Sequence, residues 1–248
     1  MLAVLYVSHG TRVAEGVLKA NQFLKRCMDQ VNVPIQRICY LELVKPDILE
    51  GIGQCVAAGA DRIIVQPILL LSARHDKRDI PGAIEKARAI YPHVRFTYGK
   101  PFGVADCIID ILLERLAEKG RTPDSEGRVL IVGRGSSDPE TPKTFSRISA
   151  ELTGKGISPV SVCYMAAAKP LIHEGLAQAG GQNTGTVYIL PCLLFPGILM
   201  RTIRKEIAES AYRTSFTLCP PLGYHPALIG LLRQRIEASV HERLSAQY

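Results

Sequence analysis

The stretch LAVLYVSHGTR, residues 2–12, decides the fold that we expect for this chain. Its apolar run Leu2–Val7 predicts a buried strand, and the Ser-His-Gly-Thr-Arg that follows predicts a polar turn at the end of that strand. The chain contains a similar pattern once more, as RVLIVGRGSSD at residues 128–138. A match of this length predicts a protein built from two similar halves.

Three further pairs of segments extend the repeat. They are ICYLELVKP (38–46) with VCYMAAAKP (162–170), QPILLL (66–71) with LPCLLF (190–195), and KPFG (100–103) followed by LLERL (112–116) with PPLG (220–223) followed by LLRQRI (231–236). The two halves meet in Lys119–Gly127, which is rich in Gly, Pro, Ser and charged residues. We therefore expect an N-terminal lobe over residues 1–120 and a C-terminal lobe over residues 127–248.

Within each half, short apolar runs alternate with stretches of helical period, a pattern that predicts an α/β fold with parallel strands. The expected strands of the first half are Leu2–Val7, Ile35–Leu41, Arg62–Leu70 and Val94–Tyr98, and its expected helices include Pro46–Ala58, Ile80–Ile90 and Val104–Leu116. We expect two similar lobes, each a four-stranded parallel sheet flanked by helices, with the active site in the cleft between them.

Composition limits the class of protein. The chain has 248 residues, of which 47% are hydrophobic and 21% charged, and no apolar run approaches the ~18 residues of a membrane helix. No signal-peptide pattern opens the sequence, so we expect a cytoplasmic protein without a membrane partner. The seven cysteines form no C-x-x-C pair and lie mostly in apolar segments, which indicates buried thiols in a reducing compartment.

The net charge of +7 suggests an anionic ligand. The basic residues are scattered, aromatic residues make up 6% of the chain, and no nucleic-acid motif is present. A polyanionic small molecule is therefore the expected partner, and nucleic acid is not.

Ligands bind beyond the carboxyl ends of parallel strands, and His9, Glu42 and His75 all follow expected strands of the first half. Two imidazoles and a carboxylate can hold a divalent metal or move protons. In the second half Arg134, Ala166 and Leu199 stand at the matching positions, while the apolar residues around them are kept. Residues needed only for packing should recur in both halves, so we expect the first lobe to be catalytic and the second to form a substrate-binding wall.

Other interpretations of these segments are weaker. Each histidine alone is as consistent with a turn or cap as with a ligand, and His225 suits a helix start as well as a site. Gly133–Asp138 lacks the third glycine of a dinucleotide fingerprint, although its backbone, including Ser136 and Ser137, remains a candidate carboxylate-binding turn. His9 and Gly10 also resemble part of the Arg-His-Gly motif of the histidine phosphatases. Ser8 stands where that motif has its phosphate-binding arginine, which argues against that family.

The sequence resembles the class II tetrapyrrole chelatases, and among them the sirohydrochlorin ferrochelatases and the related anaerobic cobalt chelatases. The resemblance rests on Leu5–Arg12, Leu41–Leu43, Leu69–His75 with Asp79-Ile80-Pro81, and Gly133–Pro139. It runs through nearly the whole chain, and the combination of S-H-G-[ST]-R with H-x3-D-I-P is specific. Short members of this family are single lobes that dimerise, so the resemblance implies that this two-lobed chain is a monomer.

The resemblance implies insertion of Fe2+ into sirohydrochlorin to form siroheme, with release of two protons and no organic cofactor. His9 and His75 would bind the metal, and Glu42 would accept protons. The implied partners of the substrate carboxylates are basic residues, namely Arg12, Lys45, Lys100, Arg134, Lys169 and Arg201. The chain has neither the His-rich segment nor the Cys-containing tail of long cobalt-inserting relatives, which favours iron. A cobalt chelatase and a non-catalytic tetrapyrrole carrier remain the alternatives.

Overall fold

The computed structural model describes residues 1–71, 78–182 and 185–241 of the chain. The chain forms two compact units. Unit 1 consists of Met1–Gly103 together with Pro226–Tyr248, and unit 2 consists of Val104–His225. None of the described helices is long and apolar enough to cross a membrane.

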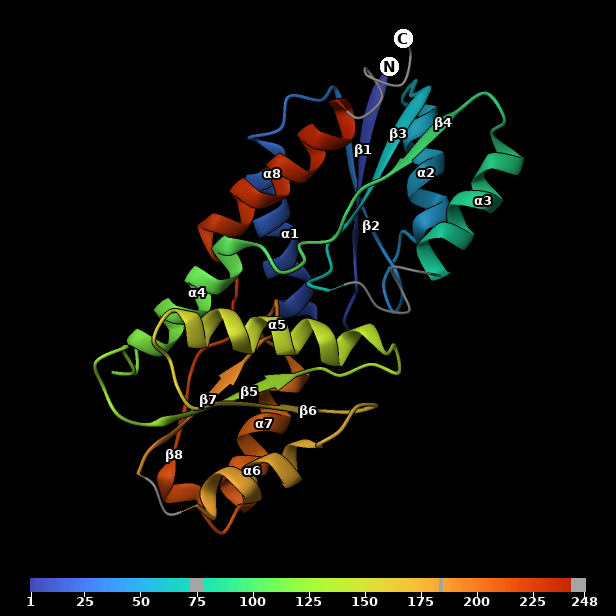
Figure 1. Cartoon of the computed structure of the whole chain (residues 1–248). Coiled ribbons are helices and arrows are strands. Elements are labelled where there is room, and N and C mark those ends of the chain that lie inside the picture. The colour runs from blue at the N-terminus through green and yellow to red at the C-terminus, as the bar shows by residue number, and fades with distance from the viewer. Residues whose placement is uncertain (72–77, 183–184, 242–248) are drawn as a thin grey trace. The chain divides into compact units, whose positions relative to one another are not determined.

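Unit 1 contains one parallel four-stranded sheet in the order β2-β1-β3-β4. Its strands are β1 (Leu2–Ser8), β2 (Ile35–Tyr40), β3 (Arg62–Pro67) and β4 (Arg95–Tyr98). Its helices are α1 (Ala14–Met28), α2 (Ile48–Ala57), α3 (Ile80–Ile90) and α8 (Pro226–His241). Figure 1 shows α1 and α8 on one face of this sheet and α2 and α3 on the other.

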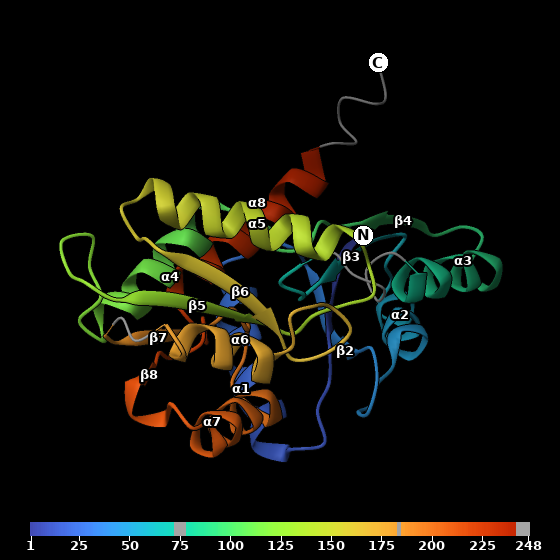
Figure 2. The same ribbon diagram turned by 60° about the horizontal axis from the view of Figure 1, so that its bottom comes forward.

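Unit 2 repeats this plan with a parallel sheet in the order β6-β5-β7-β8. Its strands are β5 (Arg128–Gly133), β6 (Val160–Tyr164), β7 (Val187–Pro191) and β8 (Phe216–Leu218). Its helices are α4 (Asp106–Ala117), α5 (Glu140–Gly154), α6 (Ile172–Gly180) and α7 (Ile198–Glu209). Figure 2 shows α4 and α5 on one face of the sheet, with α6 and α7 on the other. The predicted fold class, two four-stranded parallel sheets flanked by helices, is confirmed.

The compact units differ from the sequence repeats in one helix each. Helix α4 ends the first repeat but packs in unit 2 against α5 and β7, whereas α8 ends the second repeat and packs in unit 1 against α1 and β3. Unit 1 is therefore not residues 1–120, and unit 2 is not residues 127–248. The two helices carry similar apolar patterns, so the sequence specifies that each covers a four-stranded sheet but not which of the two sheets it covers.

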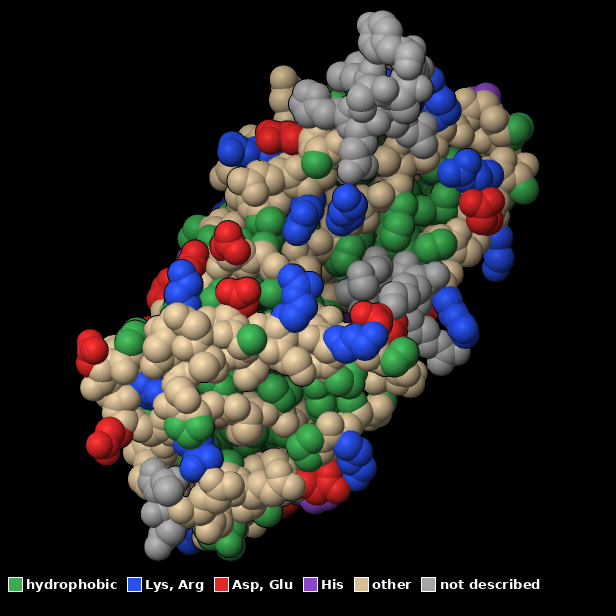
Figure 3. Space-filling view, viewed as in Figure 1, with side chains coloured by type: hydrophobic (Ala, Val, Ile, Leu, Met, Phe, Trp, Pro, Cys, Tyr) green, Lys and Arg blue, Asp and Glu red, His purple; other side chains and the backbone are tan. Residues whose placement is uncertain are grey.

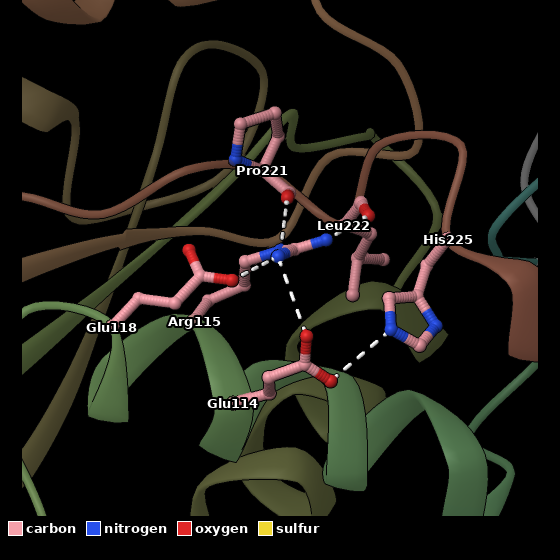
Figure 4. Close-up of polar contacts among 6 residues, drawn as sticks. All are labelled: Glu114, Arg115, Glu118, Pro221, Leu222 and His225. Carbon is pink, nitrogen blue, oxygen red and sulfur yellow. Dashed lines mark hydrogen bonds and ion pairs between the residues drawn. The ribbon is translucent and has the colours of Figure 1, made fainter.

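Equivalent arginines attach the exchanged helices. In unit 2, Arg115 of α4 donates from Nε to the carbonyl of Pro221 at 3.0 Å and from Nη2 to that of Leu222 at 3.3 Å (Figure 4). In unit 1, Arg235 of α8 donates from Nη2 to the carbonyl of Phe102 at 2.9 Å. Phe102 and Leu222 stand at matching positions of the repeat. Each arginine therefore binds the equivalent loop of the other repeat.

The buried cysteines pack the two sheets. Gly51 of α2 faces Cys39 of β2, and a Cβ added at this glycine would lie 2.8 Å from the Cβ of Cys39. Gly175 and Cys163 repeat the contact in unit 2, at 2.5 Å. Burial raises the pKa of the Cys163 thiol to about 12, so this sulfur stays protonated and unreactive near neutral pH. All seven cysteines lie among the described residues, and none forms a disulfide.

Candidate functional site

The carboxyl edge of a sheet, the edge toward which its parallel strands run, brings His9 and Glu42 together in unit 1. The amide of Leu41 donates to the Ser8 carbonyl at 2.9 Å, and the amide of Glu42 donates to the His9 carbonyl at 3.2 Å. These bonds join the carboxyl end of β1 to the segment after β2. The carboxylate Oε1 of Glu42 lies 3.5 Å from Nδ1 of His9, and both side chains are partly exposed to solvent.

Gly10 permits this close approach of the two segments. Its φ of 89° lies in the left-handed region, and a Cβ at this position would lie 2.0 Å from the carbonyl oxygen of Glu42. A larger residue would therefore push Glu42 away from His9.

The surroundings of the His9 ring assign its protonation pattern. Nδ1 faces two acceptors, the Glu42 carboxylate and the carbonyl of Gly10, the latter at 3.3 Å. Because these oxygens only accept, we place the ring proton on Nδ1. Nε2 then carries the lone pair that a metal ligand needs, and Glu42 orients the ring as carboxylates do at many metal sites.

The third predicted residue of the set, His75, lies outside the described residues, as does Arg74. Among the residues that the structure describes, no group of three or more His, Cys, Asp or Glu side chains is arranged to hold a metal. The described part of the predicted site is therefore the pair His9 and Glu42, and the inclusion of His75 stays a prediction.

The same backbone arrangement recurs at the carboxyl edge of unit 2. Met165 donates to Gly133 at 2.9 Å, and the amide of Ala166 donates to the carbonyl of Arg134 at 3.1 Å. Gly135 has a φ of 81°, and a Cβ there would lie 1.8 Å from the Ala166 carbonyl oxygen. Arg134 and Ala166 thus occupy the places of His9 and Glu42 on an equivalent backbone.

The lysines after β2 and β6 are occupied in helix capping. Lys45 Nζ lies 2.6 Å from an Asp47 oxygen and 2.8 Å from a Glu50 oxygen, the two carboxylates that cap α2. Lys169 pairs with Glu174 of α6 at 2.8 Å in the same way. Hydrogen bonds with both carboxylates raise the pKa of Lys45. Because the arrangement recurs in both units, it favours a capping role over the substrate-binding role predicted for these two lysines.

The other predicted substrate-binding residues lie in different settings. Arg12, Lys100, Arg134, Ser137 and Arg201 are exposed, as a carboxylate-binding side chain requires. The hydroxyl of Ser136 accepts a hydrogen bond from the amide of Asp138 at 3.1 Å, so it contributes to its own turn. Their contacts with substrate stay predictions.

His225 belongs to the attachment of α4. Its Nε2 lies 3.1 Å from Oε2 of Glu114, beside the cluster around Arg115, which also pairs with Glu118 (Figure 4). This contact explains a histidine at the end of the loop before α8 by packing within unit 2.

Basic side chains are scattered over the viewed face of each unit, interspersed with acidic ones, and form no continuous patch (Figure 3). This distribution agrees with the scatter of Lys and Arg along the sequence.

A hollow of about 310 Å³ lies near the starts of β5 and β6 in unit 2. It is lined by residues that include Arg121, whose guanidinium donates to the carbonyls of Gly127, Ser125 and Ser158 at 2.6–3.1 Å and to that of Thr122. These bonds hold the segment between the two repeats. The hollow lies at the amino end of the sheet, and we assign it no chemistry.

Two features of the carboxyl edge of unit 1 were missed from the sequence. Gln66 of β3 is fully buried, and Leu43 has a φ of 67° with its side chain half exposed. Gln66 is detectable as the one polar residue among the buried residues of β3, Ile63–Pro67. A left-handed leucine gives no sequence signal, although Ala167 has the equivalent φ of 60° in unit 2.

Comparison with known proteins identifies the family. The chain matches the CbiX family model over residues 3–119 and again over residues 128–239, and it belongs to this family. The two matched ranges agree with the internal repeat, and the resemblance seen in the sequence is confirmed.

Individual relatives cover nearly the whole chain. The sirohydrochlorin ferrochelatase of Priestia megaterium is 45% identical over 239 residues, which span 96% of this chain and 90% of the relative. The sirohydrochlorin cobaltochelatase of the same organism is 36% identical over 245 residues, spanning 96% of this chain and 79% of the relative. Among solved structures, SirB from Bacillus subtilis with Fe3+ has a TM-score of 0.87 at 34% identity and covers 96% of this chain and 95% of its own.

Proposed function

We propose that this protein is a metal chelatase that inserts Fe2+ into sirohydrochlorin to form siroheme. The observation that carries the proposal is the His9–Glu42 pair at the carboxyl edge of unit 1, for which unit 2 has Arg134 and Ala166 on the same backbone. Membership of the CbiX family and the relatives' names support this choice of substrate.

The reaction exchanges charge evenly. Fe2+ enters the macrocycle, two pyrrole N–H bonds break, and two protons leave, so the metal and the lost protons carry the same charge. His9 offers the Nε2 lone pair to the incoming metal and presents it to the ring. The metal then passes from His9 to the four ring nitrogens as the two protons depart.

Glu42 gives the departing protons a destination. Its carboxylate lies beside Nδ1 of His9 and is nearly half exposed, so it can accept a proton and return it to solvent. The same carboxylate keeps the imidazole oriented during metal transfer. Arg134 in unit 2 suits a different task, because a guanidinium binds a carboxylate in a bidentate manner and is no metal ligand while protonated.

The test is an absorbance assay of the purified protein with sirohydrochlorin and either Fe2+ or Co2+, because metallation shifts the macrocycle spectrum. The proposal requires insertion of Fe2+ well above the rate without protein. Insertion of Co2+ alone would support the cobalt chelatase alternative, for which the 36% identical cobaltochelatase is the relevant relative. Binding of sirohydrochlorin without turnover would support a carrier.

A further inference from the structure

Gln66 is a polar residue in the buried interior of unit 1. It is the second-last residue of β3, and its side chain has no exposed surface. Its Nε2 donates to the carbonyl of Lys100 at 2.8 Å and to that of Pro67 at 3.1 Å. Burying an amide without hydrogen bonds is costly. These two contacts satisfy the nitrogen of the Gln66 amide, whereas its Oε1 has no hydrogen-bond partner among the described residues. The bond to Lys100 ties the end of β3 to the segment that follows β4.

The bond to Lys100 lies between two backbone hydrogen bonds that join this segment to the segment of β3 and beyond. Gly99 still donates to the Val65 carbonyl at 2.9 Å, and Phe102 donates to the Leu69 carbonyl at 3.0 Å. Between them the chain turns a corner through Lys100 and Pro101. The side chain of Gln66 binds the backbone of this corner, at the carbonyl of Lys100.

Unit 2 forms the same corner without a glutamine. Cys219 donates to Ile189 at 2.8 Å and Leu222 donates to Leu193 at 3.1 Å, so the backbone path is equivalent. At the position of Lys100 stands Pro220, whose ring fixes φ and restrains the corner covalently. At the position of Gln66 stands the apolar Leu190.

Gly99 completes the difference between the two corners. A Cβ at Gly99 would lie 2.2 Å from Oε1 of Gln66, so the glutamine fits only because this residue is glycine. Unit 2, which has no glutamine to accommodate, has Cys219 there. Three positions therefore differ together: Gln66, Gly99 and Lys100 in unit 1 stand against Leu190, Cys219 and Pro220 in unit 2.

We infer that Gln66 is a positioning residue, which replaces the restraint of a proline so that a lysine can stand at this corner with its backbone fixed. The inference rests on the proposed function, because the lysine is useful only if Lys100 meets a carboxylate of the tetrapyrrole. A cation on a fixed backbone loses less conformational entropy on binding than one on a mobile loop. Gln66 thus joins His9 and Glu42 as a residue of unit 1 that a different type of residue replaces in unit 2.

The test uses Gln66→Leu, which copies unit 2, and Gln36→Leu as a matched control. Gln36 lies near the start of β2 in the same sheet, and its Nε2 also donates to two backbone carbonyls, those of Met28 and Val31, each at 3.1 Å. Both variants should lower Tm. Only Gln66→Leu should raise the KM for sirohydrochlorin, by roughly five- to tenfold, with kcat and the metal KM unchanged.

A double-mutant cycle with Lys100→Ala identifies the route of the effect. If Gln66 acts through Lys100, the double variant should have the sirohydrochlorin KM of Lys100→Ala alone. Hydrogen–deuterium exchange of the 99–103 segment should rise in Gln66→Leu and stay unchanged in Gln36→Leu. Independent, additive effects on KM, or unchanged exchange at this segment, would overturn the inference.

The outcomes also separate this inference from the proposed function. A wild-type protein that binds sirohydrochlorin but never metallates it would refute the chelatase function. The sirohydrochlorin binding constants of the variants would still test the positioning role of Gln66. A wild-type protein that metallates normally, with an unchanged KM in Gln66→Leu, would refute the positioning role alone.

Discussion

The carboxyl edges of the two units have the same backbone and different side chains. The bonds of Leu41 and Glu42 to the carboxyl end of β1 recur as those of Met165 and Ala166 to the carboxyl end of β5, with distances that agree within 0.1 Å. On this shared frame unit 1 places a histidine and a carboxylate, and unit 2 places Arg134 and an alanine. The comparison separates residues that build the edge from residues that use it, a distinction that one copy alone would not permit.

The largest expected effect comes from removing the base at the edge of unit 1. Glu42→Gln keeps the shape of the side chain but loses the carboxylate, so kcat should fall by ~10²–10⁴ with little change in sirohydrochlorin affinity. Steady-state kinetics and an absorbance titration of the ligand measure the two quantities. A collapse of ligand binding with unchanged turnover of the bound fraction would show that Glu42 positions the substrate instead.

The second effect concerns the metal. His9→Ala removes the proposed ligand. The apparent affinity for Fe2+ should fall by at least ~10–100-fold, the loss that follows mutation of residues that only hydrogen-bond to a metal ligand. His75→Ala is expected to act in the same direction. Metal-dependent kinetics, with a melting curve to verify folding, give the readout. Near wild-type activity in both single variants would remove the metal-site interpretation.

The third effect tests the other side of the comparison. Arg134→Ala should raise the KM for sirohydrochlorin by about 10–150-fold, the equivalent of ~1.5–3 kcal/mol for a charged hydrogen bond, and leave the metal dependence unchanged. A lower Tm with an unchanged KM would instead assign Arg134 a structural role. A change limited to the metal dependence would mean that the roles of the two units are reversed.

The smallest effect concerns the strained residue that both edges share. Leu43→Gly relieves a left-handed backbone worth ~1–2 kcal/mol and adds about 0.5–1 kcal/mol of unfolded-state entropy. The net gain in unfolding free energy should be about 0.5–1 kcal/mol, and Ala167→Gly should give a similar gain. Chemical denaturation measures both. A clear loss of stability in either variant would show that packing of the side chain outweighs the strain.

Much of the fold follows from the sequence because the hydrophobic period is strong. The expected helix Ile80–Ile90 has the observed bounds, and the strand expected at Ile35–Leu41 runs from Ile35 to Tyr40. The exchange of α4 and α8 was not predictable. Both helices present similar apolar faces, and the choice between two similar sheets depends on tertiary contacts such as those of Arg115 and Arg235.

The site was predictable only in part, for a similar reason. The repeat makes His9 and Glu42 recognisable, because different residues stand at the matching positions of the second half while the surrounding apolar residues are kept. The role of Gln66 was not predictable, because QPILLL matches LPCLLF as an apolar strand. The hydrogen-bond partner of Gln66 is a backbone carbonyl 34 residues away, which no local pattern indicates. The charge of Lys45 predicts a contact with a substrate carboxylate, whereas in the structure Lys45 pairs with the capping carboxylates that follow it in the sequence.

The most direct test of the central claim converts the edge of unit 1 into that of unit 2. The double variant His9→Arg/Glu42→Ala keeps the shared backbone and carries the residues of unit 2, and its metal insertion is followed by absorbance with saturating sirohydrochlorin and Fe2+. The account predicts a folded protein that still binds sirohydrochlorin and has lost metallation. Metallation at the wild-type rate would show that the chemistry does not take place at the carboxyl edge of unit 1.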